Sequence, residues 1–552
     1  MDTLKNELQK AVRGSVDDAP KTLEAASRDA GLFKVVPKEV VTPQDAQDVE
    51  ALVRFVSEKK RAGEHISVTA RSAGTDMSGG PLNDSIILNM LAMNRLLSLQ
   101  GSDEGGTAVV EPGMYFRDFD KETQKKGFEL PSYTASRELN TVGGMAANNS
   151  GGEKNLKYGK TARYVEELDV VLADGRVHTL KKLEESALRE KMAEPTFEGQ
   201  LYAKVAKLIR DNEKIIAENA PKVEKNSSGY ALWDIGDGER SLNLARLMVG
   251  AQGTLGIITK IKFRLVRPKP NASMLIVFVK DLHDLGTLVP AVLKHAPDSF
   301  ESYDDHTFAL AIKYFPEFAA QMRTGMLSLG FSFLPELWML ATGGIPKLVL
   351  MIEFRDQSQT EALAKAVALA KELHGLKLHE KMRIAENERA ARKYWTIRRE
   401  SFNLLRKKIR GMRTAPFIDD FVVPPDSLSE FLPKLTNVLS RYDLIYTVAG
   451  HVGDGNFHII PLMDPKRSDG KEIIEKLGKE VYALVLSYRG SISGEHNDGL
   501  VRTPYVSQMF GSEMEKLFEE VKNIFDPLNI FNPGKKTGTS LAQSLELLDL
   551  TK

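Results

Sequence analysis

Residues 70–80 read ARSAGTDMSGG, a glycine-rich loop between two apolar runs of β-strand character at residues 65–69 and 85–89. This strand–loop–strand setting differs from the strand–loop–helix setting of a Rossmann or P-loop nucleotide site. The backbone N–H groups of such a loop can form an anion nest, and its glycines let the backbone approach a diphosphate closely. An ordinary Gly/Ser turn is the alternative. The first interpretation predicts a bulky diphosphate cofactor held by a fold other than Rossmann.

Two further glycine-rich stretches strengthen the cofactor interpretation. Residues 140–152 read NTVGGMAANNSGG, and residues 249–259 read VGAQGTLGIIT. The first is followed by KYGKT, but six residues separate Gly152 from Gly159, whereas a Walker A loop has four between its glycines. Small residues at such positions suit a backbone pressed against a flat ring system. Three stretches of this kind, all near predicted strand ends, favour a ligand cradle over a set of unrelated turns.

Composition limits the class of protein. The chain has 552 residues, more than one hydrophobic core accommodates, so two or more domains are expected. The 75 basic and 75 acidic residues balance without a basic block, which argues against nucleic acid as a partner. The absence of cysteine excludes disulfides, catalytic thiols and cysteine-ligated iron–sulfur clusters within this chain. No apolar segment of the signal-peptide kind follows Met1, so a cytoplasmic protein is expected.

One apolar run needs a separate interpretation. Residues 326–342 read MLSLGFSFLPELWMLAT, and Pro335 and Glu336 interrupt them, so a membrane-spanning helix is not expected. A buried helix–loop–strand is the favoured interpretation. The alternative is a patch that docks an electron-accepting partner or the inner face of a membrane, which would make the protein peripheral there.

Motifs in both halves of the chain resemble those of one flavoprotein superfamily. In the first half they are residues 70–81, 110–113, 141–152, 158–161, 173–175 and 253–259. In the second half they are GHVGDGNFH at 450–458, SGEH at 493–496 and NPGK at 532–535. Their order and spacing resemble the vanillyl-alcohol oxidase/PCMH superfamily, in the branch of glycolate oxidase, D-lactate dehydrogenase and D-2-hydroxyglutarate dehydrogenase. The resemblance implies an FAD-binding domain followed by a domain that caps the isoalloxazine ring and binds the substrate.

The implied fold class is α+β, with a PCMH-type FAD-binding domain and the C-terminal cap domain of FAD-linked oxidases. The expected boundaries are 1–34 for an N-terminal helical segment, 35–268 for the FAD-binding domain, 269–500 for the cap and 501–552 for a segment that returns to the FAD-binding domain. The sequence RPKP at 267–270 marks the main boundary. Locally, apolar residues at helical spacing predict an amphipathic helix from residue 43, and residues 165–176 predict a strand and hairpin turn.

The resemblance implies that FAD is bound by the three glycine-rich stretches and by one residue near the chain end. The residues expected to bind FAD are Arg71, Ser72, Ala73, Gly74, Thr75, Asp76, Ser78, Gly79, Gly80, Thr141, Gly143, Gly144, Asn148, Ser150, Gly151, Gly159, Gly256, Ile258 and Asn532. Asp76 stands where many members of the family have a smaller or apolar residue.

Two histidines flank a predicted hairpin in the second half. The sequence GDGN at 453–456 is typical of a four-residue hairpin loop, which would place His451 opposite His458. Directly paired residues have Cβ atoms about 4.5–5.5 Å apart, close enough for two imidazoles to bind one ion. Glu495 would complete a divalent-metal site with open positions, for zinc or manganese with iron as a third option. Two packed or surface histidines are the alternative, but the resemblance agrees with metal binding.

His496 is the predicted catalytic base. A neutral imidazole near pH 7 can take the hydroxyl proton of a 2-hydroxy acid, while the metal polarises that hydroxyl. The C2 hydrogen would pass to flavin N5 as a hydride, leaving the 2-oxo acid. The resemblance implies the same base. In the alternative, His496 only orients Glu495.

Arg398 is the predicted anchor for the substrate carboxylate. The segment WTIRRES at 395–401 resembles the family segment whose first arginine binds that group, and a bidentate fork is the physical reason. Arg399 would face another side of a helix. A solvated helix face is the alternative.

One position departs from the family pattern. Asn497 stands where the family usually has glycine after the Glu-His pair. Asparagine tolerates left-handed backbone better than most residues, so the turn can persist. Its side chain is expected to enter near the base and to narrow the choice of substrate.

These residues predict an FAD-dependent dehydrogenase of a small D-2-hydroxy acid of the lactate, glycolate or 2-hydroxyglutarate type. The D preference is implied by resemblance alone. Reduced flavin would pass electrons to oxygen, a quinone, an electron-transfer flavoprotein, a cytochrome or a separate iron–sulfur subunit. The alternatives are a non-redox FAD transferase of the alkylglycerone-phosphate synthase type and a non-catalytic FAD-binding subunit of an oxidase complex.

Overall fold

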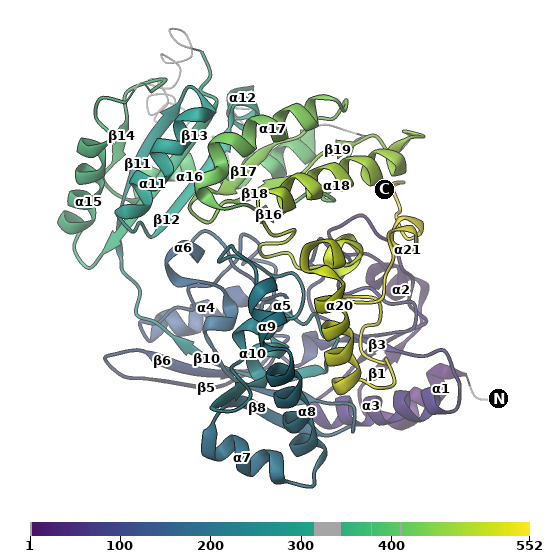
Figure 1. Ribbon diagram of the computed structural model, residues 1–552. Helices are drawn as coiled ribbons and strands as arrows, with labels where there is room; N and C mark the ends of the chain where they lie inside the picture. Colours follow the sequence, from purple (N-terminus) through teal and green to yellow (C-terminus); the bar gives the residue numbers. More distant parts are fainter. Residues whose placement is uncertain (1–2, 314–343, 377, 409–410, 552) are drawn as a thin grey trace.

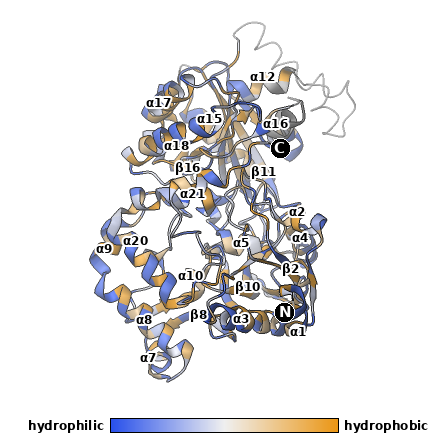
Figure 2. Cartoon of the chain, turned by 90° about the vertical axis from the view of Figure 1, so that its right-hand side faces the viewer, coloured by the Kyte–Doolittle hydropathy of each residue, from blue (hydrophilic) through white to orange (hydrophobic). Residues whose placement is uncertain are grey.

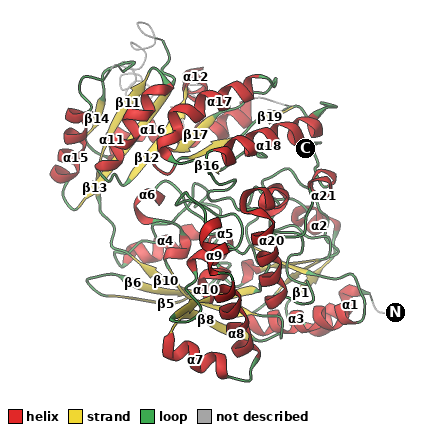
Figure 3. Ribbon diagram, viewed as in Figure 1, coloured by secondary structure: helices red, strands yellow, loops and turns green. Residues whose placement is uncertain are grey.

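The computed structural model describes residues 3–313, 344–376, 378–408 and 411–551. The chain forms two parts, which lie one above the other in Figure 1, and each is built of sheets covered by helices (Figure 3). Helices and strands mix in both parts, so the predicted α+β fold class is confirmed. The apolar run at 326–342 lies outside the described residues.

The first part contains a four-stranded sheet in the order β1-β2-β4-β3, which holds the glycine-rich loop. Its strands are β1 (Ser15–Asp17), β2 (Glu39–Thr42), β3 (Val68–Arg71) and β4 (Ile86–Asn89). Strands β3 and β4 are parallel neighbours, with Val68 opposite Ile86. The predicted strand–loop–strand setting is confirmed, and the loop leaves the end of β3 at the edge of this sheet.

The second sheet of this part is antiparallel and has the order β5-β6-β10-β7-β8-β9. Its strands are β5 (Leu96–Gly101), β6 (Gly106–Val110), β7 (Val165–Val171), β8 (Val177–Glu184), β9 (Ser241–Asn243) and β10 (Ile257–Leu265). The predicted strand and turn at 165–176 are β7 and its hairpin to β8. Apolar side chains of this sheet and its helices form the largest core of the first part.

Helices surround these sheets. They are α1 (Leu4–Ala11), α2 (Pro20–Ala26), α3 (Ala46–Arg61), α4 (Phe116–Lys125), α5 (Val142–Asn148), α6 (Asn155–Tyr158), α7 (Glu185–Ala193), α8 (Phe197–Asp211), α9 (Glu213–Asn219) and α10 (Leu244–Met248). The predicted amphipathic helix is α3, which begins after Asp45 because the Asp45 carboxylate accepts hydrogen bonds from the first-turn N–H groups. Its apolar face is fully buried, and in Figure 2 outer helices such as α8 and α9 likewise carry both hydrophilic and hydrophobic residues.

The second part, the cap, is built on a seven-stranded antiparallel sheet in the order β14-β11-β13-β12-β17-β18-β16. Its strands are β11 (Asn271–Val279), β12 (Ser299–Asp304), β13 (Leu348–Asp356), β14 (Arg383–Ala385), β16 (Phe421–Val422), β17 (Val448–His451) and β18 (Asn456–Ile459). A separate pair joins β15 (Arg413–Thr414) to β19 (Leu462–Met463). The cap helices are α11 (Leu285–Lys294), α12 (Asp305–Lys313), α15 (Gln359–Glu372), α16 (Glu388–Lys408), α17 (Leu428–Ser440) and α18 (Gly470–Ser487). Strands β12, β17 and β18 lie side by side, which brings residues far apart in the sequence to one place.

The chain crosses between the two parts twice. It enters the cap before β11 and returns through α19 (Gly499–Arg502), α20 (Val506–Phe525) and α21 (Leu541–Glu546). Helix α20 packs against α8 and α9 of the first part. A buried Lys522 ammonium lies 2.5 Å from Asp526 and donates hydrogen bonds to the carbonyls of Thr254 and Phe531 at 2.7 Å. The cap is therefore connected to the first part at both of its ends.

Among the helices of the described residues, none is both long and apolar enough to cross a membrane.

Replacing Lys522 tests how the returning segment is held. Lys522→Met leaves the fully buried Asp526 carboxylate without its ammonium partner, which should cost about 3–5 kcal/mol of unfolding free energy. Urea denaturation followed by circular dichroism measures this loss. The matched control is Lys516→Met, at an exposed position of the same helix, which should change stability little. Equal denaturation midpoints for the two variants would contradict the assignment.

Candidate active site

The loop after β3 divides its backbone N–H groups into two sets. Asp76 Oδ2 accepts hydrogen bonds from the N–H groups of Ser78 (3.2 Å) and Gly80 (2.8 Å), and Asp29 Oδ2 accepts one from Gly79 (2.7 Å). Burial and the nearby Asp76 raise the pKa of Asp29 to about 7. In the described part of the chain, the N–H groups of residues 72–77 donate no hydrogen bond. The N–H groups that remain available to an anion are thus confined to the first half of the loop, whereas the prediction used the whole loop.

A cavity runs along this loop and the two other glycine-rich stretches. Among the residues expected to bind FAD, those that line it are Arg71, Ser72, Gly74, Thr75, Asp76, Gly80, Gly143, Gly144, Asn148, Ser150, Gly151, Gly256 and Ile258. Sequence reasoning missed other lining residues, such as Met77, Gln252 and the segment 134–136. Glu495 and His496 line the same cavity, so the cap contributes to its wall.

Six of the expected FAD-binding residues do not line the cavity: Ala73, Ser78, Gly79, Thr141, Gly159 and Asn532. Ser78 is buried beneath the start of α19, where its carbonyl accepts a hydrogen bond from the Leu500 N–H (2.7 Å). Thr141 caps α5 instead. Asn532 supports the wall from behind, because its amide donates hydrogen bonds to the carbonyls of Gly80 (2.9 Å) and Gln252 (2.7 Å).

The histidine hairpin forms, but with a different register from the predicted one. His451 pairs with Asn456, and His458 pairs with Ala449, so the loop is 452–455 and not 453–456. The physical reason is Gly455, whose left-handed backbone (φ +68°) ends the short turn η6 (Val452–Asp454). Only glycine fits there, because a Cβ would lie 1.8 Å from the Val423 carbonyl oxygen. The two imidazoles are therefore diagonal neighbours on one sheet face, with ring centroids 5.3 Å apart.

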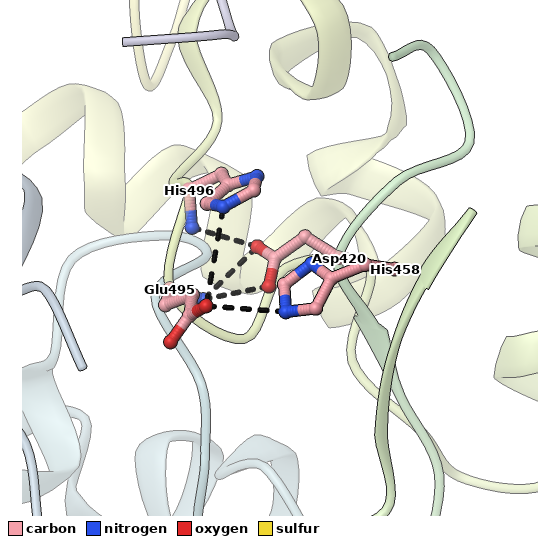
Figure 4. A group of neighbouring side chains, drawn as sticks. All are labelled: Asp420, His458, Glu495 and His496. Carbon is pink, nitrogen blue, oxygen red and sulfur yellow. Dashed lines mark hydrogen bonds and ion pairs between the residues drawn. The ribbon is translucent and has the colours of Figure 1, made fainter. Parts of the chain in front are cut away.

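Three imidazoles converge on one carboxylate oxygen. Glu495 Oε1 lies 3.5 Å from His451 Nε2, 3.2 Å from His458 Nε2 and 3.9 Å from His496 Nε2. In Figure 4, dashed lines join the Glu495 carboxylate to the imidazoles of both His458 and His496. Of the three imidazoles, only that of His496 lines the cavity. The predicted metal ligands and the predicted base are thus brought together.

The opposite nitrogen of each ring contacts a carboxylate. His451 Nδ1 lies 2.5 Å from Glu301, while His458 Nδ1 (3.1 Å) and His496 Nδ1 (2.7 Å) share Asp419. A carboxylate at Nδ1 keeps the proton there and leaves Nε2 as the acceptor or metal ligand. The three Nε2 atoms all face Glu495 Oε1, where a bound cation would take the place of their protons.

The electrostatics of the cluster favour positive charge at its centre. Burial alone would lower the pKa of His458, but the Asp419 and Glu495 carboxylates outweigh it and raise that pKa to about 10. Burial likewise opposes ionisation of Glu495, yet Lys225 and His451 hold its pKa well below the usual range. A buried site of this kind suits a bound cation.

Asp420 lies in the same group of side chains but has another role. Its carboxylate accepts hydrogen bonds from the N–H groups of Glu495 (3.0 Å) and His496 (2.7 Å) and from the Ser493 hydroxyl (2.8 Å). With its lone pairs used in this way, Asp420 fixes the 493–496 loop (Figure 4). The side chains whose possible ligand atoms lie within 4.8 Å of one another are Asp420, His458, Glu495 and His496, a set that includes two of the three predicted ligands.

Sequence reasoning missed four residues of this centre: Lys225, Glu301, Asp419 and Asp420. The Lys225 ammonium is buried 3.1 Å from Glu495 Oε2. The two aspartates stand alone as charges in the apolar stretch APFIDDFVV at 415–423, which is a signal that could have identified them. Lys225 and Glu301 carry no such signal in their neighbourhoods.

The two arginines of α16 point in different directions, as expected for adjacent helical residues. Arg398 Nε lies 3.3 Å from Glu301 Oε2, next to the histidine cluster. Arg399 instead forms an ion pair with Glu153 of the first part at 2.5 Å. Arg398 of this helix thus lies next to the histidine cluster, while Arg399 links the cap to the first part.

Asn497 adopts the left-handed backbone expected for it, with φ +68°. The prediction that its side chain enters near His496 is wrong. Its amide donates hydrogen bonds to the carbonyls of Gly250 (2.8 Å) and Asn148 (3.2 Å), and its oxygen accepts one from Lys536 (2.6 Å). Asn497 therefore ties the turn to the cavity loops.

Known families account for both parts of the chain. A family model described as an FAD binding domain matches residues 37–181, and one described as the C-terminal domain of FAD linked oxidases matches residues 268–536. Domain content and cavity together define an FAD-binding flavoprotein. More specifically, the chain combines an FAD binding domain with the C-terminal domain of FAD linked oxidases.

Curated relatives align along most of the chain. A D-2-hydroxyglutarate dehydrogenase of Pseudomonas putida is 28% identical, with 95% of this chain and 50% of that protein covered. The glycolate oxidase subunit GlcD of Bacillus subtilis is 25% identical (91% and 89% covered), and a D-lactate dehydrogenase of Archaeoglobus fulgidus is 26% identical (90% and 90%). The chain spans about half the length of the D-2-hydroxyglutarate dehydrogenases it matches.

Solved structures confirm the predicted PCMH-type fold. Substrate-bound p-cresol methylhydroxylase superposes with a TM-score of 0.67 at 17% identity, covering 98% of this chain and 96% of that one. An alkyldihydroxyacetonephosphate synthase has the same TM-score at 16% identity, covering 97% and 86%. At these identities the likeness describes the fold alone.

Gly74 offers a test of the cavity wall. Its φ is +68°, and a Cβ would lie 2.2 Å from Arg71 Nη2, so Gly74→Ala must displace the guanidinium from the loop. Strain of about 1–3 kcal/mol at this position should weaken FAD binding, measured by fluorescence titration. Gly63→Ala is the matched control, since Gly63 also has positive φ (+90°) but no atom within 4 Å. Unchanged FAD affinity in Gly74→Ala would count against this wall of the site.

Proposed function

We propose that the chain catalyses the FAD-dependent oxidation of a small D-2-hydroxy acid to its 2-oxo acid. One observation carries the proposal: His496 lines the cavity while its Nε2 lies 3.9 Å from the carboxylate oxygen that also faces His451 and His458. A base, a cation site and a cofactor cavity therefore meet at one point. The names of the relatives, which include D-2-hydroxyglutarate dehydrogenase, D-lactate dehydrogenase and glycolate oxidase, support this class of substrate.

The cavity fits FAD in its chemistry. The unpaired N–H groups of residues 72–77 can bind the diphosphate, and small residues such as Gly143 and Gly144 leave room for a flat ring. FAD, when bound, supplies the two-electron acceptor.

The cluster also fits a divalent cation. His451 and His458 would supply Nε2, Glu495 would supply a carboxylate oxygen, and this donor set suits zinc, manganese or iron. The carboxylates at the Nδ1 atoms orient the rings, as in many metal sites. A bound cation supplies a Lewis-acid charge for the substrate hydroxyl and carboxylate.

His496 is placed to receive the hydroxyl proton at Nε2. Its Nδ1 faces Asp419 at 2.7 Å, which fixes the tautomer and stabilises the imidazolium after proton uptake. Burial opposes that charge, but Asp419 and Asp420 outweigh burial and raise the pKa of His496. The proton is thus held on the cap side of the cavity.

Arg398 is placed to hold the substrate carboxylate. Its Nε faces Glu301, and in the described residues its terminal nitrogens form no hydrogen bond, so a bidentate fork is available. Glu301 therefore contacts both Arg398 and His451.

The electrons leave to a separate acceptor. The chain has no cysteine to ligate an iron–sulfur cluster, so the acceptor is a quinone, an electron-transfer flavoprotein, a cytochrome, oxygen or a separate iron–sulfur subunit. Docking at the inner face of a membrane is part of this proposal, and the 326–342 segment proposed for it lies outside the described residues.

Anaerobic stopped-flow absorbance tests the reaction. D-hydroxy acids should bleach the flavin of the FAD- and metal-loaded protein, with L-enantiomers as the comparison. Chelation of the metal should slow bleaching by about 10–100-fold while FAD stays bound. A flavin that no hydroxy acid bleaches would overturn the proposal and favour the non-redox transferase alternative. Unchanged bleaching after chelation would remove only the cation from it.

A substitution of the base tests its assignment. His496→Gln should slow flavin reduction by about 10²–10⁴-fold, because the proton has no other acceptor at that position, while FAD content stays unchanged. His65→Gln is the control, since that imidazole is 79% exposed and lies outside the cavity lining. Equal reduction rates in the two variants would exclude His496 as the base.

A further inference from the structure

Lys225 reaches the metal centre from the other part of the molecule. It follows α9 in the first part, and its side chain is almost fully buried. Its Nζ lies 3.1 Å from Glu495 Oε2. The FAD-binding half therefore supplies a cation to a carboxylate that belongs to the cap.

The segment after Lys225 is joined to the cap by several hydrogen bonds. The Ser227 N–H donates to the Ser493 carbonyl (2.9 Å), while Ser228 Oγ (2.6 Å) and the Gly229 N–H (2.9 Å) donate to the Asp498 carboxylate. Their partners in the cap, Ser493 and Asp498, lie on either side of Glu495 in the sequence. These bonds fix the backbone next to Lys225 relative to the backbone next to Glu495.

The two oxygens of Glu495 therefore face different partners. Oε1 faces the three imidazole Nε2 atoms, at 3.2 to 3.9 Å, and Oε2 faces Lys225. A carboxylate held in this way offers a cation one oxygen and not two. One coordination position then stays open for the substrate.

The other nearby lysine does not perform this task. Lys160 Nζ donates to the Gly494 carbonyl (2.9 Å) and to the Ser227 hydroxyl (2.5 Å), so it fixes the backbone before Glu495. Asp420 fixes the backbone N–H groups of the same loop. Among the described lysines, only Lys225 contacts a side-chain oxygen of Glu495.

We propose that Lys225 is a positioning residue that keeps Glu495 a single-oxygen ligand and so preserves the open coordination position of the cation. The expected effect of Lys225 on flavin reduction rests on the proposed function. Its expected effect on cation binding rests on the cation site alone. The inference also makes the complete centre a product of both parts of the molecule.

Lys225→Met tests the inference with Mn²⁺ as the probe. Without the ammonium, Glu495 should chelate Mn²⁺ with both oxygens, so Mn²⁺ should bind at least as tightly as to the unmodified protein. Water-proton relaxivity of bound Mn²⁺ should fall, because one coordinated water is displaced. Flavin reduction by the best hydroxy acid should slow by about 10–100-fold. Lys225→Arg keeps a cation at this position and should restore the relaxivity.

Lys222→Met is the matched control, since Lys222 is exposed three residues earlier. Parallel loss of Mn²⁺ affinity and reduction rate in Lys225→Met would show a merely structural lysine and overturn the inference. Unchanged relaxivity, or failure of the unmodified protein to bind Mn²⁺, would overturn it as well. If no hydroxy acid reduces the flavin, the proposed function fails, and the Mn²⁺ measurements still decide the role of Lys225.

Discussion

The buried negative charge of Glu495 is the constraint on which the rest of the centre depends. A carboxylate removed from water needs compensating partners, or its desolvation destabilises the fold. The cap surrounds one oxygen with three imidazoles, and the FAD-binding half brings an ammonium to the other. The imidazoles in turn contact two further carboxylates, that of Glu301 at His451 and that of Asp419 at both His458 and His496. The network therefore extends outward from one side chain until it includes both parts of the chain.

Much of the fold could be predicted because the sequence carries strong local signals. The apolar spacing from residue 49 onward and the capping Asp45 define α3 without help from the rest of the molecule. The loop at 70–80 was also recognisable, since its glycines and flanking apolar runs are contiguous. What the sequence did not reveal is that Asp76 and Asp29 use the N–H groups of its second half. The division of the N–H groups depends in part on Asp29, which lies 50 residues before Gly79 in the sequence.

The site was predictable where residue types are rare and unpredictable where they are common. Histidine occurs ten times in the chain, so His451, His458 and His496 stood out. Their supporting carboxylates are a few among 75 acidic residues, and only tertiary structure selects Glu301 and Asp419. The predicted register of the histidine hairpin was wrong for a different reason. A pattern of turn-forming residues does not say which residue closes the turn, and here the left-handed Gly455 closes it one position early.

The double connection of the cap has a kinetic consequence. A domain joined at one end can swing widely, whereas a domain joined at both ends can rotate only about the line between its two attachments. Because Glu495 and His496 form part of the cavity wall, any such rotation changes the wall itself. The rate at which the cavity exchanges its contents is therefore coupled to the motion of the cap, because the wall is complete only while the two parts stay in contact.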